Sequence, residues 1–160
     1  AAEAGLDNVE TLEGEMEAIP LADDSVDHVI SNGVINLSPR KARALAECAR
    51  VLRSSGKLSV SDLTIVEEEL PTEVLTHPAA WAGCVSGALA EGDFVRKLER
   101  AGFTEIAVHH REPMSVDDCA LYPLFTDDLI ELMRSLIPSD QQRAVATSIV
   151  VTARLPPKAG

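Results

Sequence analysis

The chain has 160 residues, of which 46% are hydrophobic and only 3% aromatic, so we expect one domain with a core of aliphatic side chains. Its formal net charge of −12 disfavours nucleic acid as a partner, and no long apolar run predicts a membrane-spanning helix. The three cysteines are widely spaced and form no CxxC motif, which argues against a disulfide framework or a zinc cage. We therefore expect a cytoplasmic location.

The first part of the chain predicts two strands separated by a loop. Val9–Leu12 is a short candidate strand. Gly14–Ser25 contains Pro20 and a cluster of turn-forming residues, which predicts a loop. Val26–Ser31 is apolar and β-branched, which indicates a buried strand.

A helix and a third strand are expected next. Ser38 is expected to act as the N-cap and Pro39 to occupy the first helical position. Gly56 is expected to end this helix in a left-handed conformation, and Lys57–Ile65 then predicts a strand. The residues expected on the buried face of the helix are Ala42, Leu45, Ala46, Ala49 and Leu52.

The second part continues the alternation of helices and strands. This pattern predicts an α/β fold with a mostly parallel sheet, and the last two strands are expected to pair antiparallel. Helices are expected at Pro71–Leu89 with a break near His77, at Asp93–Ala101 with a stop at Gly102, at Val116–Leu121 and at Asp127–Leu136; strands are expected at Thr104–His110 and Thr147–Leu155.

Three segments in this order resemble class I S-adenosylmethionine-dependent methyltransferases. Glu13–Ser31 is similar to the signature that spans the third and fourth strands of that family. Ala49–Leu58 is similar to its turn into strand five, and Leu98–Phe103 to its L-x-x-A-G-F helix end. The resemblance implies a partial Rossmann-like sheet, strands 3 to 7 of the family order 3-2-1-4-5-7-6, flanked by helices. We expect residues 1–160 to form a single, truncated methyltransferase-like domain.

Two further segments are similar to arsenite methyltransferases. Ser31–Pro39 resembles their S-N-C-V-I-N-L-S-P segment, with Gly33 in place of the cysteine. Ala82–Leu89 resembles the segment that carries one of their arsenic-binding cysteines, which corresponds to Cys84. At the approximate spacing of another such cysteine the chain has Arg134.

The resemblance implies a set of site residues. Glu15 and Met16 would contact the adenine of S-adenosylmethionine through a carboxylate and a backbone N–H group. Asn32 and Gly33 follow a strand, where open α/β sheets bind ligands, and are further candidates for cofactor binding. Cys84 is the candidate catalytic residue and arsenic ligand, because a thiolate suits trivalent arsenic. The alternative for Cys84 is a small buried apolar residue.

Other polar and sulfur-containing residues have less specific interpretations. Asp62 ends the Lys57–Ile65 strand, where it could face the same site. Cys48 and Cys119 are expected to be structural, and His77 to be a turn residue.

The family's glycine-rich loop has no counterpart in these 160 residues, because no GxGxxG-like sequence occurs. We therefore expect the isolated chain to bind S-adenosylmethionine weakly or not at all. We also expect a homodimer, or a rearranged first strand, to cover the edge of Val26–Ser31. Two alternatives stay open. The chain could be a non-catalytic binding or dimerisation module, or a fragment of a methyltransferase for another small molecule.

Overall fold

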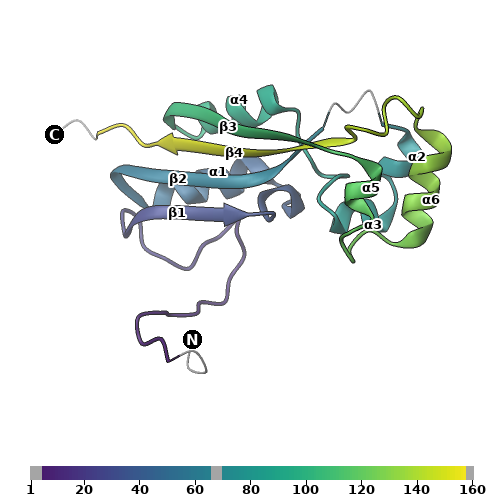
Figure 1. Ribbon diagram of the computed structural model, residues 1–160. Coiled ribbons are helices and arrows are strands. Elements are labelled where there is room, and N and C mark those ends of the chain that lie inside the picture. The colour runs from purple at the N-terminus through teal and green to yellow at the C-terminus, as the bar shows by residue number, and fades with distance from the viewer. Residues whose placement is uncertain (1–4, 66–69, 158–160) are drawn as a thin grey trace.

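The structure is a computed structural model that describes residues 5–65 and 70–157. A four-stranded sheet forms its centre, and helices lie against one face and one end of it (Figure 1). The strands are β1 Val26–Asn32, β2 Leu52–Thr64, β3 Thr104–Met114 and β4 Ala146–Arg154. The helices are the 3-10 helix η2 Ile35–Leu37 and the α-helices α1 Lys41–Val51, α2 Thr72–Leu75, α3 Pro78–Ala82, α4 Glu91–Arg100, α5 Val116–Cys119 and α6 Asp127–Leu136.

The sheet has the strand order β1-β2-β4-β3. β1 pairs with β2 in parallel, whereas β4 lies antiparallel to both β2 and β3. Three strands therefore share one direction and β4 opposes them, which confirms the expected antiparallel pairing of the last two strands. The order also matches the 4-5-7-6 part of the order that the family resemblance implies, so the sheet is a partial Rossmann-like one.

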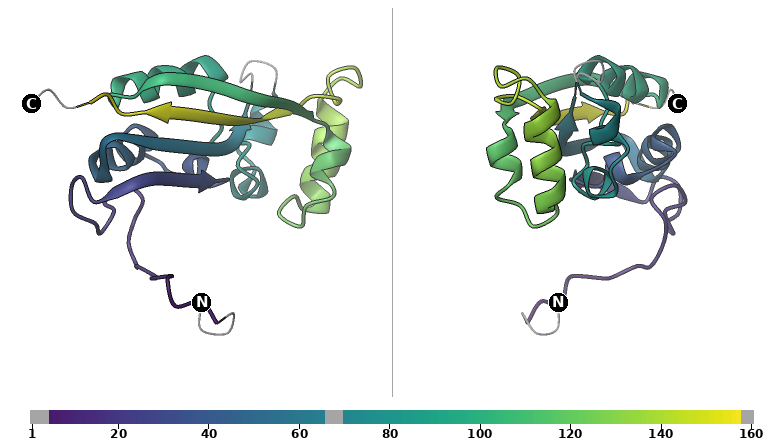
Figure 2. Two further views of the ribbon diagram at one scale, coloured as in Figure 1. Left: turned by 60° about the vertical axis from the view of Figure 1, so that its left-hand side comes forward. Right: turned by 90° about the vertical axis from the view of Figure 1, so that its right-hand side faces the viewer.

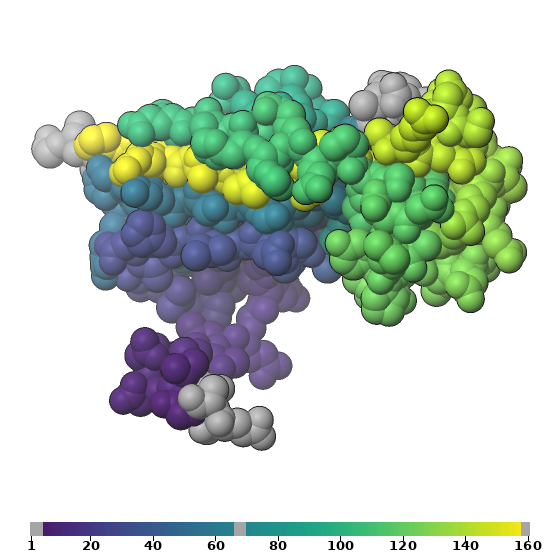
Figure 3. Space-filling model, viewed as in Figure 1, coloured from purple at the N-terminus to yellow at the C-terminus, as the bar shows by residue number. Residues whose placement is uncertain are grey.

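The two faces of the sheet differ in what covers them. α1 and α4 lie against one face, as the two views of Figure 2 show, and bury apolar side chains of β2 and β4 beneath them. On the opposite face, side chains of all four strands are visible at the surface in Figure 3. The fully buried residues on the covered side include Leu45, Leu58, Val60, Leu98 and Val151.

A second apolar cluster lies at the end of the sheet where β1 terminates (Figure 1). Its centre is α6, whose Leu129 and Met133 are completely buried. The observed bounds of α6 are those expected from its apolar periodicity. In the described residues, no helix is long and apolar enough to cross a membrane.

Two predictions for the first part of the chain are wrong. Val9–Leu12 is irregular and exposed, because no described strand lies beside it to complete its backbone hydrogen bonds. β1 exists but is not buried: it lies at the edge of the sheet, and Ile30 is 81% exposed. The loop expected at Gly14–Ser25 is confirmed.

The boundaries of α1 also differ from expectation. Arg40 is the N-cap and the helix begins at Lys41, because the Ser38 hydroxyl is used by a turn and accepts the Arg40 N–H at 3.0 Å. Gly56 lies inside β2, and the residue with a positive φ is Ser55. A Cβ at position 56 would lie 2.7 Å from the Arg53 carbonyl oxygen, so a close backbone approach explains this glycine.

The buried face of α1 is rotated by about one residue from the prediction. Ala42 and Ala46 are exposed, whereas Ala44 and Cys48 are buried beside Leu45. The helix starts two residues later than expected. Because alanines occur on both of its faces, the sequence does not determine which face is buried. The break expected near His77 is confirmed, but residues 83–89 are not helical.

Candidate functional site

A cavity of about 450 Å³ lies at the carboxyl ends of β1 and β2, a size typical of small-molecule sites. We call it the Cys84 cavity. Its walls combine polar groups at the carboxyl ends of the two strands with apolar groups from α3, β3 and the α5–α6 connection. The lining residues are Asn32, Gly33, Leu37, Ser61, Asp62, Leu63, Ala82, Gly83, Cys84, Met114, Tyr122, Leu124, Phe125 and Ser148.

Cys84 has an unusual backbone conformation for a residue with a side chain. It follows the short helix α3, donates its N–H to the Trp81 carbonyl at 2.9 Å, and has a φ of +63°. This left-handed conformation costs about 1–2 kcal/mol in a residue with a Cβ. Its Sγ donates to the Gly33 carbonyl oxygen at 3.3 Å, which joins α3 to the end of β1.

The charges around Cys84 favour the protonated thiol. Burial raises the pKa of the Cys84 thiol, and the negative charge of Asp62 raises it further. The positive charge of Lys41 opposes both effects. Cys84 is therefore a buried thiol at neutral pH rather than a thiolate.

Asp62 is a buried carboxylate held by Asn36. The Asn36 side-chain amide donates to Asp62 Oδ1 at 2.8 Å, and the Asn36 backbone N–H donates to Oδ2 at 3.2 Å. Burial raises the pKa of Asp62, while hydrogen bonds from the backbone of Leu63, Asn36 and Ile35 and the positive charge of Lys41 act in the opposite direction. Asn36 is itself buried, and its Oδ1 has no hydrogen-bond partner among the described residues. Asn36 does not itself line the cavity; it supports the wall by holding Asp62.

Glu15 and Met16 belong to a turn outside the Cys84 cavity. The Ala18 N–H donates to the Glu15 carbonyl at 3.0 Å, and we call Glu15–Ala18 the Glu15 turn. Glu15 is exposed and Met16 half-buried, whereas the Glu17 carboxylate is buried and accepts a hydrogen bond from the Ser38 hydroxyl. That hydrogen bond lowers the pKa of Glu17. Because Ser38 directly follows Leu37, Glu17 connects the turn to the rim of the cavity.

The structure brings together four of the residues singled out in the sequence. Asn32, Gly33, Asp62 and Cys84 all line the Cys84 cavity, although they come from three separate segments. Met16 and Glu15 do not line it. Sequence reasoning did not assign Glu17, Asn36, Ser38 or Lys41 to the site. The sequence marks them at most as polar residues near the end of a predicted strand or helix.

The other residues considered in the sequence lie outside the Cys84 cavity and have structural roles. Burial raises the pKa of Cys48 to about 11 and that of Cys119 to about 12, so both are inert thiols in the apolar interior. His77 caps α3 by accepting the Ala79 N–H at 3.2 Å, which agrees with a turn role. Arg134 is half-exposed on α6 and pairs with Asp117 at 2.8 Å, so it offers no soft ligand to the cavity.

Comparison with known sequences identifies a family and its members. Residues 1–102 match the family described as a methyltransferase domain. The arsenite methyltransferase of Halobacterium salinarum is 39% identical over 102 residues, which are 64% of this chain and 26% of that protein. The human arsenite methyltransferase is 38% identical over 99 residues, which are 60% of this chain and 26% of that protein. The chain thus spans about a quarter of the length of these relatives.

Comparison with solved structures gives a consistent result. An arsenic(III) S-adenosylmethionine methyltransferase from Chlamydomonas reinhardtii is 35% identical, with a TM-score of 0.62 over 92% of this chain and 44% of that one. The YcgJ protein of Bacillus subtilis superposes with a TM-score of 0.76 over 98% of this chain and 75% of that one. Its identity is only 15%, so this likeness concerns the fold alone.

Proposed function

Because this chain belongs to the methyltransferase domain family and resembles arsenite methyltransferases, we propose that it binds a soft methyl acceptor, trivalent arsenic, at Cys84. S-adenosylmethionine is the cofactor of the family. The observation that carries the proposal is the position of Cys84, whose thiol lies in a cavity at the carboxyl ends of two parallel strands. Ligands of open α/β sheets bind at such ends.

The residues present are compatible with part of a cofactor site. Gly33 has a φ of +63° and open space where a Cβ would lie, so a ligand can approach its backbone. Asn32 lies beside it at the cavity wall. Glu15 and Met16 would hold the adenine, and Asn32 and Gly33 the neighbouring part. When bound, S-adenosylmethionine supplies an electrophilic methyl group on a sulfonium sulfur.

The thiol of Cys84 would bind arsenic without an external base. When arsenous acid condenses with a thiol, an S–As bond forms while the S–H and one As–O bond break. The thiol proton then leaves with the hydroxide as water, so a protonated Cys84 is a competent starting state. Burial and the charge of Asp62 raise the pKa of this thiol, and the charge of Lys41 opposes them. The apolar wall of Met114, Leu124 and Phe125 limits the access of water to the bound arsenic.

The test is a titration of the purified chain with arsenite and with phenylarsine oxide. Trp81 is the single tryptophan of the chain, is 53% exposed and precedes Cys84 by three residues, so its fluorescence reports on the site. We expect Cys84→Ser to weaken binding by more than about 100-fold, because even outer partners of a bound metal are worth about 10- to 100-fold.

Cys48→Ala and Cys119→Ala are the matched controls, because each removes a buried thiol that does not line the cavity. Both variants should bind arsenic as the wild type does. Equal binding by wild type and Cys84→Ser, or loss of binding in either control, would contradict the proposal.

A second candidate function is a dimerisation module, which the exposed strand edge favours. No described strand pairs with the outer edge of β1, and the apolar Ile30 on that strand is 81% exposed. Such an edge favours pairing with another strand, and we propose a second copy of the chain as its occupant. Light scattering should then give the mass of a dimer, and Ile30→Lys the mass of a monomer. A monomeric wild type would contradict this candidate and leave the arsenic proposal unaffected.

A further inference from the structure

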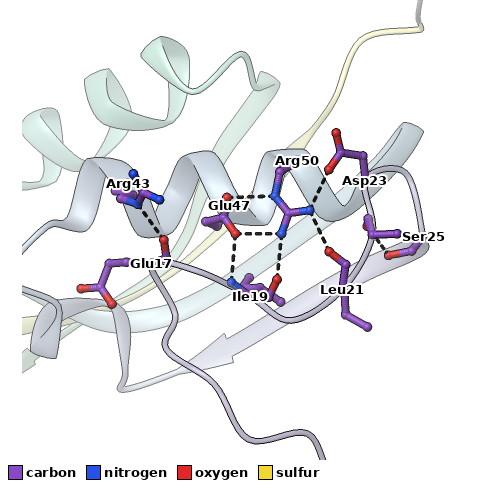
Figure 4. Close-up of polar contacts among 9 residues, drawn as sticks. Glu17, Ile19, Leu21, Asp23, Ser25, Arg43, Glu47 and Arg50 are labelled. Atoms are coloured by element: carbon purple, nitrogen blue, oxygen red, sulfur yellow. Dashed lines mark hydrogen bonds and ion pairs between the residues drawn. The ribbon is translucent and has the colours of Figure 1, made fainter.

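One arginine makes several of the contacts that attach the segment between the Glu15 turn and β1 to the protein. Arg50 of α1 donates Nη2–H to the Ile19 carbonyl and Nη1–H to the Leu21 carbonyl, each at 2.8 Å (Figure 4). Its Nη1 also pairs with the Asp23 carboxylate at 2.7 Å. One guanidinium thus contacts three alternate residues of an irregular segment, which its planar array of five donors permits.

Glu47, one helical turn before Arg50, completes the attachment. Its carboxylate accepts Arg50 Nε–H at 2.9 Å and Nη2–H at 2.8 Å, which orients the guanidinium. The same carboxylate accepts the Ile19 N–H at 2.9 Å, so both polar backbone groups of Ile19 are bound by α1 (Figure 4). We call Glu47 and Arg50 the Arg50 pair.

The attachment continues to the Glu15 turn itself. Arg43, one further turn along α1, donates Nε–H to the Glu17 carbonyl at 2.8 Å. Residues 17–23 therefore lie along α1, and its polar side chains rather than a neighbouring strand hold them. Ile19 adds an apolar contact with the cluster beneath the covered face of the sheet.

We infer that the Arg50 pair consists of positioning residues, which fix the Glu15 turn relative to the Cys84 cavity. The inference rests on the proposed role of Glu15 and Met16 at the cofactor's adenine. Without the pair, the segment keeps its peptide bonds to β1 but loses hydrogen bonds at Ile19 and Leu21. The Glu15 turn would then be held only through Glu17, by Ser38 and Arg43, and a ligand would have to order the rest of it on binding.

The test compares Arg50→Gln with Arg53→Gln as a matched control. Arg53 is a half-exposed arginine of β2 that pairs with Asp27 of β1 at 2.7 Å. Hydrogen exchange measured amide by amide should be about tenfold faster at Ala18 and Ile19 in Arg50→Gln, because charged hydrogen bonds of this kind are lost. Exchange at Val60, in the centre of the sheet, should stay unchanged. Arg50→Lys should restore protection only in part, because an ammonium cannot reproduce the planar fork.

The second measurement is the affinity for S-adenosylhomocysteine, determined well below the melting temperature of each variant. We expect Arg50→Gln to weaken binding by about tenfold and Arg53→Gln to leave it unchanged. Equal acceleration of exchange at Ile19 and Val60 would overturn the inference, because Arg50 would then act only as a general stabiliser. If Arg50→Gln and the wild type bind S-adenosylhomocysteine equally, the cofactor role of the Glu15 turn fails, and the exchange data still decide whether Arg50 positions the turn.

Discussion

The Cys84 cavity and the Glu15 turn lie near each other but are held in place by different forces. The cavity wall is supported by an apolar cluster in which Leu129, Met133 and Cys119 are completely buried. The Glu15 turn is held by charged side chains of α1, with little apolar burial of its own. Packing therefore determines one half of the site and a few oriented hydrogen bonds determine the other. The two halves should respond to different perturbations.

The largest effect is expected where the cavity depends on packing. Leu129→Ala should lower the free energy of unfolding by about 2–5 kcal/mol, because it leaves a void in the centre of the apolar cluster. Urea denaturation measures the change. Leu136→Ala on the same helix is the control, since Leu136 is 41% exposed and its truncation should cost much less. Equal costs for the two variants would show that α6 does not support the cavity through burial.

A smaller effect is expected at Gly87, where two backbone segments meet. A Cβ at this position would lie 2.3 Å from the Asn36 carbonyl oxygen, so the backbone must shift. We expect Gly87→Ala to cost about 1–3 kcal/mol and to weaken arsenic binding, because the Asn36 and Cys84 segments would move apart. Gly92→Ala is the matched control: it lies in α4 near only the Arg96 side chain and should stabilise by about 0.5–1 kcal/mol. Equal stabilities of the two variants would contradict the expected clash.

The smallest effect is expected from acid, through the protonation of Glu47. The hydrogen bond from Arg50 lowers the pKa of Glu47 below its ordinary value of 4.5, and the nearby charge of Arg43 adds to this. The stabilisation by Glu47 is therefore complete above about pH 4.5 and is lost as the pH falls through the lowered pKa. Wild type should exceed Glu47→Gln in unfolding free energy by about 1 kcal/mol at neutral pH. Urea denaturation from pH 7 to pH 3 measures this difference, and a pH-independent difference would contradict the assignment.

Sequence patterns predicted the elements that depend on local periodicity. Asp127–Leu136 is apolar on one face over its whole length, and its bounds were predicted correctly. Signals at single residues failed where tertiary contacts competed with them. The Ser38 hydroxyl serves Glu17 rather than the first turn of α1, and Gly56 makes room for a backbone inside a strand. Val9–Leu12 shows the same dependence, because a strand needs a neighbour that its own sequence does not reveal.

The candidate site, like the fold, could be predicted from the sequence only in part. Asn32 and Gly33 come directly after the predicted strand Val26–Ser31, so their place at its carboxyl end could be deduced. Cys84 was singled out by resemblance. The role of Arg50 could not be deduced, because its contacts join residues 27 to 31 positions apart through an irregular segment. No periodicity marks such contacts, and they become visible only when α1 and the loop are placed together.

The left-handed backbone at Cys84 makes this position a compromise between folding and chemistry. In most places glycine is less stabilising than alanine, because it gives the unfolded chain more freedom. At a φ of +63° the order should reverse, so that Cys84→Gly folds more stably than Cys84→Ala. The protein therefore keeps its sulfur at the residue where the backbone would favour having no side chain at all.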